Sequence, residues 1–115
     1  MRNTASVNTA GALPSRLIGA ADRVPASLGQ LAGPDRGRVS LPVRLAWSGP
    51  NEFDVSDSGQ RLTLYRMLLD CGQREDIIRY VNADLLRLDW TRIRRLTARR
   101  LIGLWERLLP ELADA

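Results

Sequence analysis

Residues 98–109, ARRLIGLWERLL, decide the fold class, because their apolar side chains recur with the period of an α-helix. The apolar positions follow the spacing i, i+3, i+4, i+7, which places them on one face of a helix. Charged residues and a glycine fall on the other face, and Pro110 ends the segment because it cannot continue a helix. The residues expected to face a core are Leu101, Leu104, Trp105 and Leu108.

A helix is also predicted over residues 58–70, where both ends carry recognisable signals. Asp57 is followed three residues later by Gln60, the pattern of a capping box. Gly72 stands where a glycine commonly ends a helix. The segment between these signals carries the apolar residues Leu62, Leu64, Tyr65, Met67, Leu68 and Leu69.

Residues 74–81 predict a short helix, with acidic residues in its first turn that favour the helix dipole. Asn82 is a good N-cap for a further helix that begins near Ala83. Asp89 interrupts the apolar pattern of this helix. We expect a break near residues 95–97, the alternative being one long helix from Trp90 to Leu109.

Residues 39–47, VSLPVRLAW, alternate between apolar and other side chains, the period of a β-strand. Pro42 has no N–H to donate, so such a strand belongs at the edge of a sheet. Because no second strand pattern is found, we expect either an extended arm packed on the helices or a strand that pairs with another chain. Leu41, Val43 and Leu45 are therefore candidate partner contacts.

The first 38 residues differ in composition from the rest, with many Gly, Pro, Ala, Ser and Thr and only isolated larger apolar residues. Such a segment buries too little apolar surface to offset its ordering entropy. We therefore predict a disordered or weakly ordered tail over residues 1–38 and a small helical binding domain over residues 39–115. The expected fold class is all-α, a small bundle of three to four short helices with an N-terminal extended arm or edge strand.

The composition argues against an enzyme. The 115 residues include 17 arginines, no lysine, no histidine and a single cysteine, Cys71. Imidazole catalysis, histidine metal ligands and an internal disulfide are therefore excluded. With no phosphate-binding loop or nucleophile motif either, we expect a binding protein with no catalytic residues, metal or cofactor. No run reaches 18 apolar residues, so the expectation is a cytoplasmic protein that does not enter a membrane.

The placement of the arginines is more informative than their number, which GC-rich codon usage explains. Seven arginines and two acidic residues lie between positions 85 and 107, a net charge of +5. In a continuous helix Arg92, Arg95 and Arg99 would line one face. Such a stripe is either a solvated face or a contact for an acidic protein or nucleic acid. Since Trp and Arg are enriched at binding hot spots, the candidate partner-binding residues here are Trp90, Arg92, Arg94, Arg95, Arg99 and Arg100.

Three stretches carry a family resemblance: residues 47–57 (WSGPNEFDVSD), 64–82 (LYRMLLDCGQREDIIRYVN) and 84–90 (DLLRLDW). They resemble small actinobacterial antitoxin-like proteins (MenA-like) that are encoded beside AbiEii-type nucleotidyltransferase toxins. Members of that family carry a Leu-Pro turn before the last helix, where this chain has Leu96-Thr97. The matching positions are Phe53, Asp54, Asp57, Tyr65, Gly72, Glu75, Asp76, Tyr80, Val81, Leu85, Leu86 and Trp90.

The resemblance implies a protein that binds a nucleotidyltransferase toxin by protein–protein contact and holds it inactive. Arginines are suited to pair with the carboxylates of an acidic, metal-binding active site. The alternative is a small basic DNA-binding transcriptional regulator, in which short helices precede a basic helix. A further alternative is a homo-oligomeric helical module with no other partner.

Overall fold

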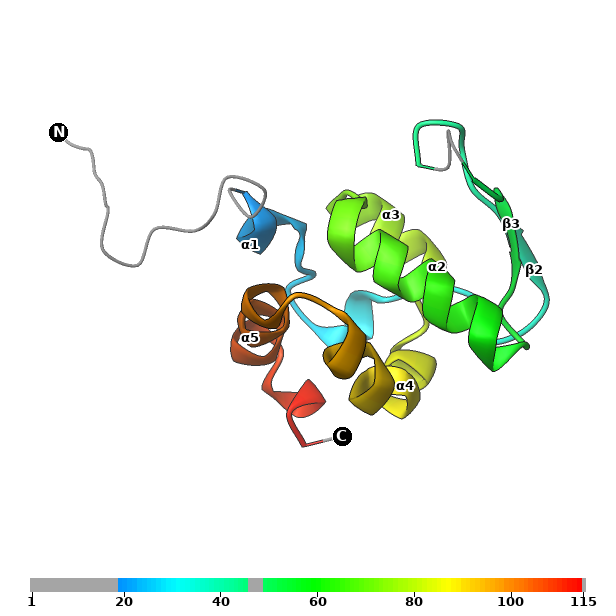
Figure 1. The fold of residues 1–115 in the computed structure, drawn as a ribbon. Coiled ribbons are helices and arrows are strands. Elements are labelled where there is room, and N and C mark those ends of the chain that lie inside the picture. The colour runs from blue at the N-terminus through cyan, green and yellow to red at the C-terminus, as the bar shows by residue number, and fades with distance from the viewer. Residues whose placement is uncertain (1–18, 46–48, 115) are drawn as a thin grey trace, which may run out of the picture.

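The computed structural model describes residues 19–45 and 49–114, and these residues form a mostly helical body with one small antiparallel sheet. Figure 1 shows α2 crossing the middle of the molecule, with the β2–β3 hairpin on one side and α1 and α5 on the other. The all-α prediction therefore holds for the bulk of the chain, to which a sheet is added. The elements are α1 (Ala20–Arg23), η2 (Leu28–Gln30), β2 (Arg38–Ser40), β3 (Glu52–Asp54), α2 (Ser58–Cys71), α3 (Arg74–Tyr80), α4 (Ala83–Leu96), α5 (Arg99–Leu108) and η3 (Pro110–Leu112).

Both ends of α2 lie close to where the sequence predicts them. The Asp57 carboxylate accepts hydrogen bonds from the backbone N–H groups of Gly59 and Gln60, at 2.9 and 3.3 Å. The Gln60 side chain accepts from the Asp54 N–H instead of closing a capping box, and so ties the helix start to β3. Gly72 ends the helix with φ −77°, which is not left-handed. Glycine is needed there because the Cβ of any other residue would lie 2.8 Å from the Leu68 carbonyl oxygen.

The predicted break between the last two helices is confirmed. The Asn82 side chain accepts from the Leu85 N–H at 3.0 Å and caps the start of α4. This helix runs through Asp89 without interruption and ends at Leu96, and α5 begins at Arg99. Two residues therefore separate α4 from α5, and the alternative of one continuous helix is wrong.

The strand predicted over residues 39–47 is wrong in its extent and in its lack of a partner. β2 covers Arg38–Ser40 and pairs antiparallel with β3, Val39 opposite Phe53. The chain turns after Leu41, where the Leu45 N–H donates to the Pro42 carbonyl at 3.0 Å. With three residues, β3 is too short to show an alternating pattern, so no strand is predicted there from the sequence. Trp47 lies outside the described residues.

The structure also differs from the predicted weakly ordered tail over residues 19–38, whereas residues 1–18 lie outside the described part. Ala20, Val24 and Leu28 are buried in the hydrophobic core. Ala20 begins α1, Val24 is its C-cap and Leu28 begins η2. Because Pro25 interrupts the chain between Val24 and Leu28, their four-residue spacing does not predict a continuous helix. This segment buries apolar surface against the helices instead of within itself.

A short stretch of this segment also closes the end of α3. The N–H groups of Ala32 and Gly33 donate to the carbonyls of Ile78 and Val81, at 2.8 and 2.9 Å. Carbonyls at a helix C-terminus have no partner within the helix and need one from elsewhere. A Cβ on Gly33 would overlap the backbone of Tyr80, so only glycine permits this approach.

A buried ion pair joins α2 to α4 at the centre of the fold. Arg61 and Asp89 are both buried, and the guanidinium donates to both carboxylate oxygens, from Nε at 2.6 Å and from Nη2 at 3.0 Å. Arg61 Nη1 also donates to the Val55 carbonyl at 2.9 Å, and Arg92 donates to Asp89 from the same helix at 2.9 Å. The pair thus connects the β3–α2 loop, α2 and α4, and each guanidinium nitrogen and each carboxylate oxygen of the pair makes a hydrogen bond.

The charge state of Asp89 follows from the balance of burial and hydrogen bonding. Burial disfavours the carboxylate, but the hydrogen bonds from Arg61 and then Arg92 outweigh it and leave the pKa of Asp89 below its ordinary value. A carboxyl whose pKa is lowered by folding stabilises the fold at neutral pH. That stabilisation is lost as the pH falls below about 4, the ordinary pKa of aspartic acid, toward the folded pKa.

Replacing Asp89 by alanine is expected to lower the free energy of unfolding by about 3–5 kcal/mol, because the Arg61 guanidinium would stay buried without its counter-charge. Chemical denaturation followed by circular dichroism measures the loss. The double variant R61M/D89L, which removes both charges, should recover much of this stability. A D89A variant as stable as the parent chain would contradict the role given to the pair.

Candidate partner-binding surface

The structure divides the predicted arginines into bonded and exposed ones. Arg92 donates to Asp89 and, at 3.5 Å, to the Ser58 carbonyl, so it supports the buried pair. Arg94 forms two hydrogen bonds to Glu106, at 2.8 and 3.3 Å, while about half of its side chain stays exposed. These two residues have structural partners and are weaker candidates for binding.

Arg95, Arg99 and Arg100 are exposed, and no ion pair or side-chain hydrogen bond joins them to residues 19–45 or 49–114. Arg95 lies in the last turn of α4, whereas the other two begin α5. The stripe expected for a continuous helix is therefore broken between α4 and α5. What replaces it is a basic corner at the α4–α5 turn, formed by Arg95, Leu96, Arg99 and Arg100.

Trp90 is buried with 1% of its surface exposed, so it cannot contact a partner in this conformation. Its ring packs against that of Trp105, with the centroids 6.4 Å apart, and its Nε1 donates to Glu106 at 2.7 Å. Glu106 is thereby held between Trp90 and Arg94, and these bonds lower its pKa, that from Trp90 most. The predicted binding role of Trp90 is replaced by a role in fixing α4 against α5.

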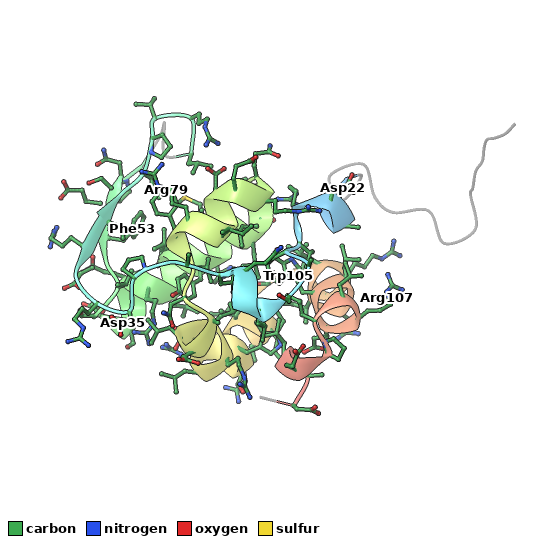
Figure 2. The ribbon with its side chains drawn as sticks, turned by 180° about the vertical axis from the view of Figure 1, so that it is seen from behind. Asp22, Asp35, Phe53, Arg79, Trp105 and Arg107 are labelled. Carbon is green, nitrogen blue, oxygen red and sulfur yellow. The ribbon has the colours of Figure 1, made fainter. Side chains whose placement is uncertain are left out.

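The predicted arm contacts are also divided. Leu41 and Leu45 are buried in the core, and only Val43, 76% exposed, is open to a partner. These residues follow β2 in the chain. Figure 1 shows β2 and β3 on one side of α2 and α5 on the opposite side, and the rear view in Figure 2 agrees. The arm and the basic corner therefore do not form one continuous surface.

Two exposed leucines flank α5 and were not among the predicted binding residues. Leu96, 49% exposed, precedes the turn into α5, and Leu108, 43% exposed, ends it. Figure 2 shows Arg107 projecting from α5 away from the body, whereas Trp105 points inward. The sequence assigned Leu108 to the apolar face, and its place in the last turn of the helix explains why it is exposed.

A hollow of about 480 Å³ adjoins the basic corner between α2 and the α4–α5 turn. Arg66 of α2 reaches across and donates to the Leu96 carbonyl at 2.6 Å, which anchors the turn. The Thr97 hydroxyl is buried and has no hydrogen-bond partner in the described part of the chain. The residues that line the hollow are Thr63, Arg66, Met67, Asp70, Leu96, Thr97 and Ala98.

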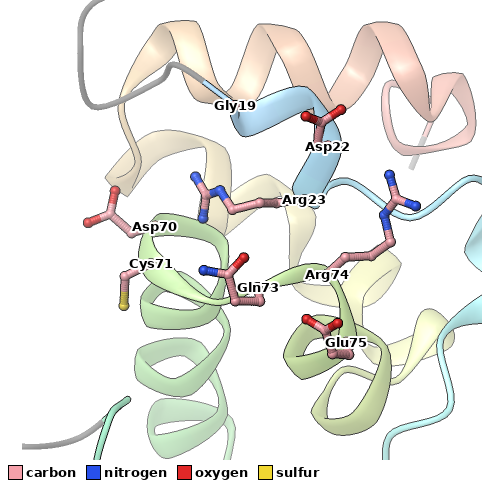
Figure 3. A pocket seen from close by; sticks show the side chains of 8 residues that line it. All are labelled: Gly19, Asp22, Arg23, Asp70, Cys71, Gln73, Arg74 and Glu75. Carbon is pink, nitrogen blue, oxygen red and sulfur yellow. The ribbon is translucent and has the colours of Figure 1, made fainter.

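A larger hollow of about 710 Å³ lies between α1, the end of α2 and the start of α3. Figure 3 shows side chains of both charges around it, with Arg23 reaching from α1 toward the end of α2. That guanidinium donates to the Gly72 carbonyl at 3.0 Å, so it closes the helix end. Burial raises the pKa of the nearby Cys71 thiol, which opposes thiolate chemistry. Within the described residues no acidic or cysteine cluster could hold a metal ion.

No protein-family model, curated protein or solved structure matches this chain. The resemblance carried by the sequence motifs therefore stays a prediction. In the part of the chain that the structure describes, every helix is too short or too polar to cross a membrane. The arginines of the basic corner and Val43 are predicted partner-binding residues that stay exposed in the structure.

The two kinds of arginine should respond differently to substitution. R92A is expected to lower the free energy of unfolding by about 1 kcal/mol, because Asp89 loses a charged hydrogen bond. R95A should change it by less than about 0.5 kcal/mol, as is usual for an exposed residue without partners. Thermal or urea denaturation of both variants measures the difference, and equal effects would show that the division is wrong.

Proposed function

We propose that this chain is an antitoxin-like protein that acts in the cytoplasm, where it binds a nucleotidyltransferase toxin by protein–protein contact and neutralises it. The motif resemblance described above supports the class of partner. The observation that carries the proposal is the basic corner, where three guanidiniums stand exposed beside Leu96. Most other arginines of α2 and α4 are tied to carboxylates or carbonyls of the same chain.

The chemistry of the corner fits a carboxylate-rich surface. Guanidinium groups bind carboxylates through paired hydrogen bonds, which are about twice as strong as neutral ones. This chain uses the same pairing internally, between Arg44 and Asp76 and between Arg61 and Asp89. An acidic, metal-binding active site would offer similar partners to the exposed arginines, and covering it would block the enzyme.

Co-expression with the product of the adjacent reading frame tests the proposal. The two proteins should co-purify, and growth inhibited by the partner alone should be restored. The triple variant R95A/R99A/R100A should lose both effects while its circular dichroism spectrum stays unchanged. If the adjacent frame encodes no nucleotidyltransferase, or if co-expression gives neither complex nor rescue, the proposal fails.

A matched control separates the basic corner from overall charge. The triple variant R36A/R74A/R79A also lowers the net charge by three. It removes three other exposed arginines, one from the loop before β2 and two from α3. This variant should bind and rescue like the parent chain. Equal loss in both triple variants would assign the effect to net charge and not to the corner.

DNA binding is the second candidate, and the short connection between α4 and α5 favours it. Two helices joined by two residues, with exposed arginines on the second, are compatible with a helix-turn-helix arrangement. A regulator should bind duplex DNA at low salt and lose about 10³-fold or more in affinity between 50 and 200 mM salt. Fluorescence anisotropy with a promoter fragment measures this. An antitoxin without a DNA role should show little binding at either salt concentration.

A further inference from the structure

The exposed face of α5 contains a glycine that the fold does not require. Arg99, Gly103 and Arg107 follow one another at the spacing i, i+4, i+8, so they lie in one row along the helix, with Arg100 beside them. Gly103 is exposed, and a Cβ built on it meets nothing within 4 Å. Its backbone is helical and has no positive φ. Within residues 19–45 and 49–114, neither packing nor conformation therefore explains glycine at this position.

A glycine in the middle of an exposed helix is unfavourable on its own. It destabilises a helix relative to alanine because it loses more backbone freedom on folding. Its compensating property is that it lets another chain approach the helix backbone closely. Here the approach would occur between Arg99 and Arg107, which lie one turn before and one turn after Gly103 in the same row. Their forked guanidiniums could hold carboxylates on either side of the contact.

The acidic residue of this helix does not oppose such a contact. Glu106 is turned toward α4, where it accepts hydrogen bonds from Trp90 and Arg94. Only 16% of its side chain is exposed. The exposed charges of α5 are therefore all basic, with Arg99, Arg100 and Arg107 around Gly103. We call these four residues the α5 face.

We propose that the α5 face docks on a carboxylate-bearing segment of the nucleotidyltransferase partner, whose main chain packs against Gly103. This inference rests on the proposed function and locates its contact. The exposed Leu96, which ends α4, and the exposed Leu108, which ends α5, favour a protein over nucleic acid. Protein interfaces combine arginine with apolar side chains, whereas nucleic-acid contacts are more polar.

G103A tests the inference, because it separates stability from binding. Alanine should raise the melting temperature by about 2–6 °C through its higher helix propensity. The added methyl group should at the same time weaken binding to the purified partner at least tenfold, as measured by calorimetry. A variant that is more stable but binds less well is not expected from a merely structural glycine.

Two further variants complete the experiment, G59A as the matched control and R107K as a second test of the α5 face. G59A makes the same change in the first turn of α2, where the added Cβ would meet only Asp57 at 3.4 Å. It should leave affinity unchanged. R107K keeps the charge but loses the guanidinium fork, so it should weaken binding several-fold.

The outcomes distinguish this inference from the function on which it rests. If the parent chain binds the partner and G103A binds equally well, the docking face is wrong while the antitoxin proposal stands. If the parent chain does not bind the partner, both fail. If duplex DNA binds the parent chain and G103A weakens that binding instead, the occupant is nucleic acid and the protein-docking proposal is overturned.

Discussion

The buried pair of Arg61 and Asp89 is the interaction on which the arrangement of the helices depends. Removing two charges from water is expensive, and the cost is offset only where geometry and further hydrogen bonds are good. Here the guanidinium makes two bonds to the carboxylate and a third to the Val55 carbonyl. These requirements fix α4 against α2 and against the loop that follows β3.

The position of α4 in turn determines where the basic corner lies. Because α4 is held along its length, its last turn and the two residues after it have a defined place, which Arg66 secures from α2. Trp90 and Glu106 then hold α5 against α4. The exposed arginines are therefore carried on a rigid support, which reduces the entropy lost when a partner binds.

The caps of the main helices could be predicted from the sequence because they depend on neighbouring residues. Asp57 and Asn82 act within three positions of themselves. The pairing of β2 with β3 and the docking of residues 19–33 depend on residues far away in the chain, and no local pattern announces them. The same is true of Arg61 and Asp89, which are 28 positions apart.

The prediction of the candidate site failed in part for the same reason. In the sequence, Asp89 only interrupts an apolar pattern. The structure shows that this residue is a buried charge whose partner, Arg61, lies far away in the chain. Trp90, the next residue, is also buried, because its ring packs against Trp105 and its Nε1 donates to Glu106. Gly103 carried a signal that was visible in the sequence, a glycine inside a strongly periodic helix, and only its surroundings showed that packing does not explain it.

The docking of Gly33 on the end of α3 has a consequence for the order in which the chain folds. Residues 19–33 are synthesised before α2 and α3, yet the carbonyls that they close belong to Ile78 and Val81. Arg23 likewise meets Gly72, 49 positions later. The segment has no acceptors for these hydrogen bonds until α2 and α3 have formed. It therefore binds to the helical body as a covalently tethered ligand would. Its association should be a late step of folding, since contacts this distant close only after the local ones have formed.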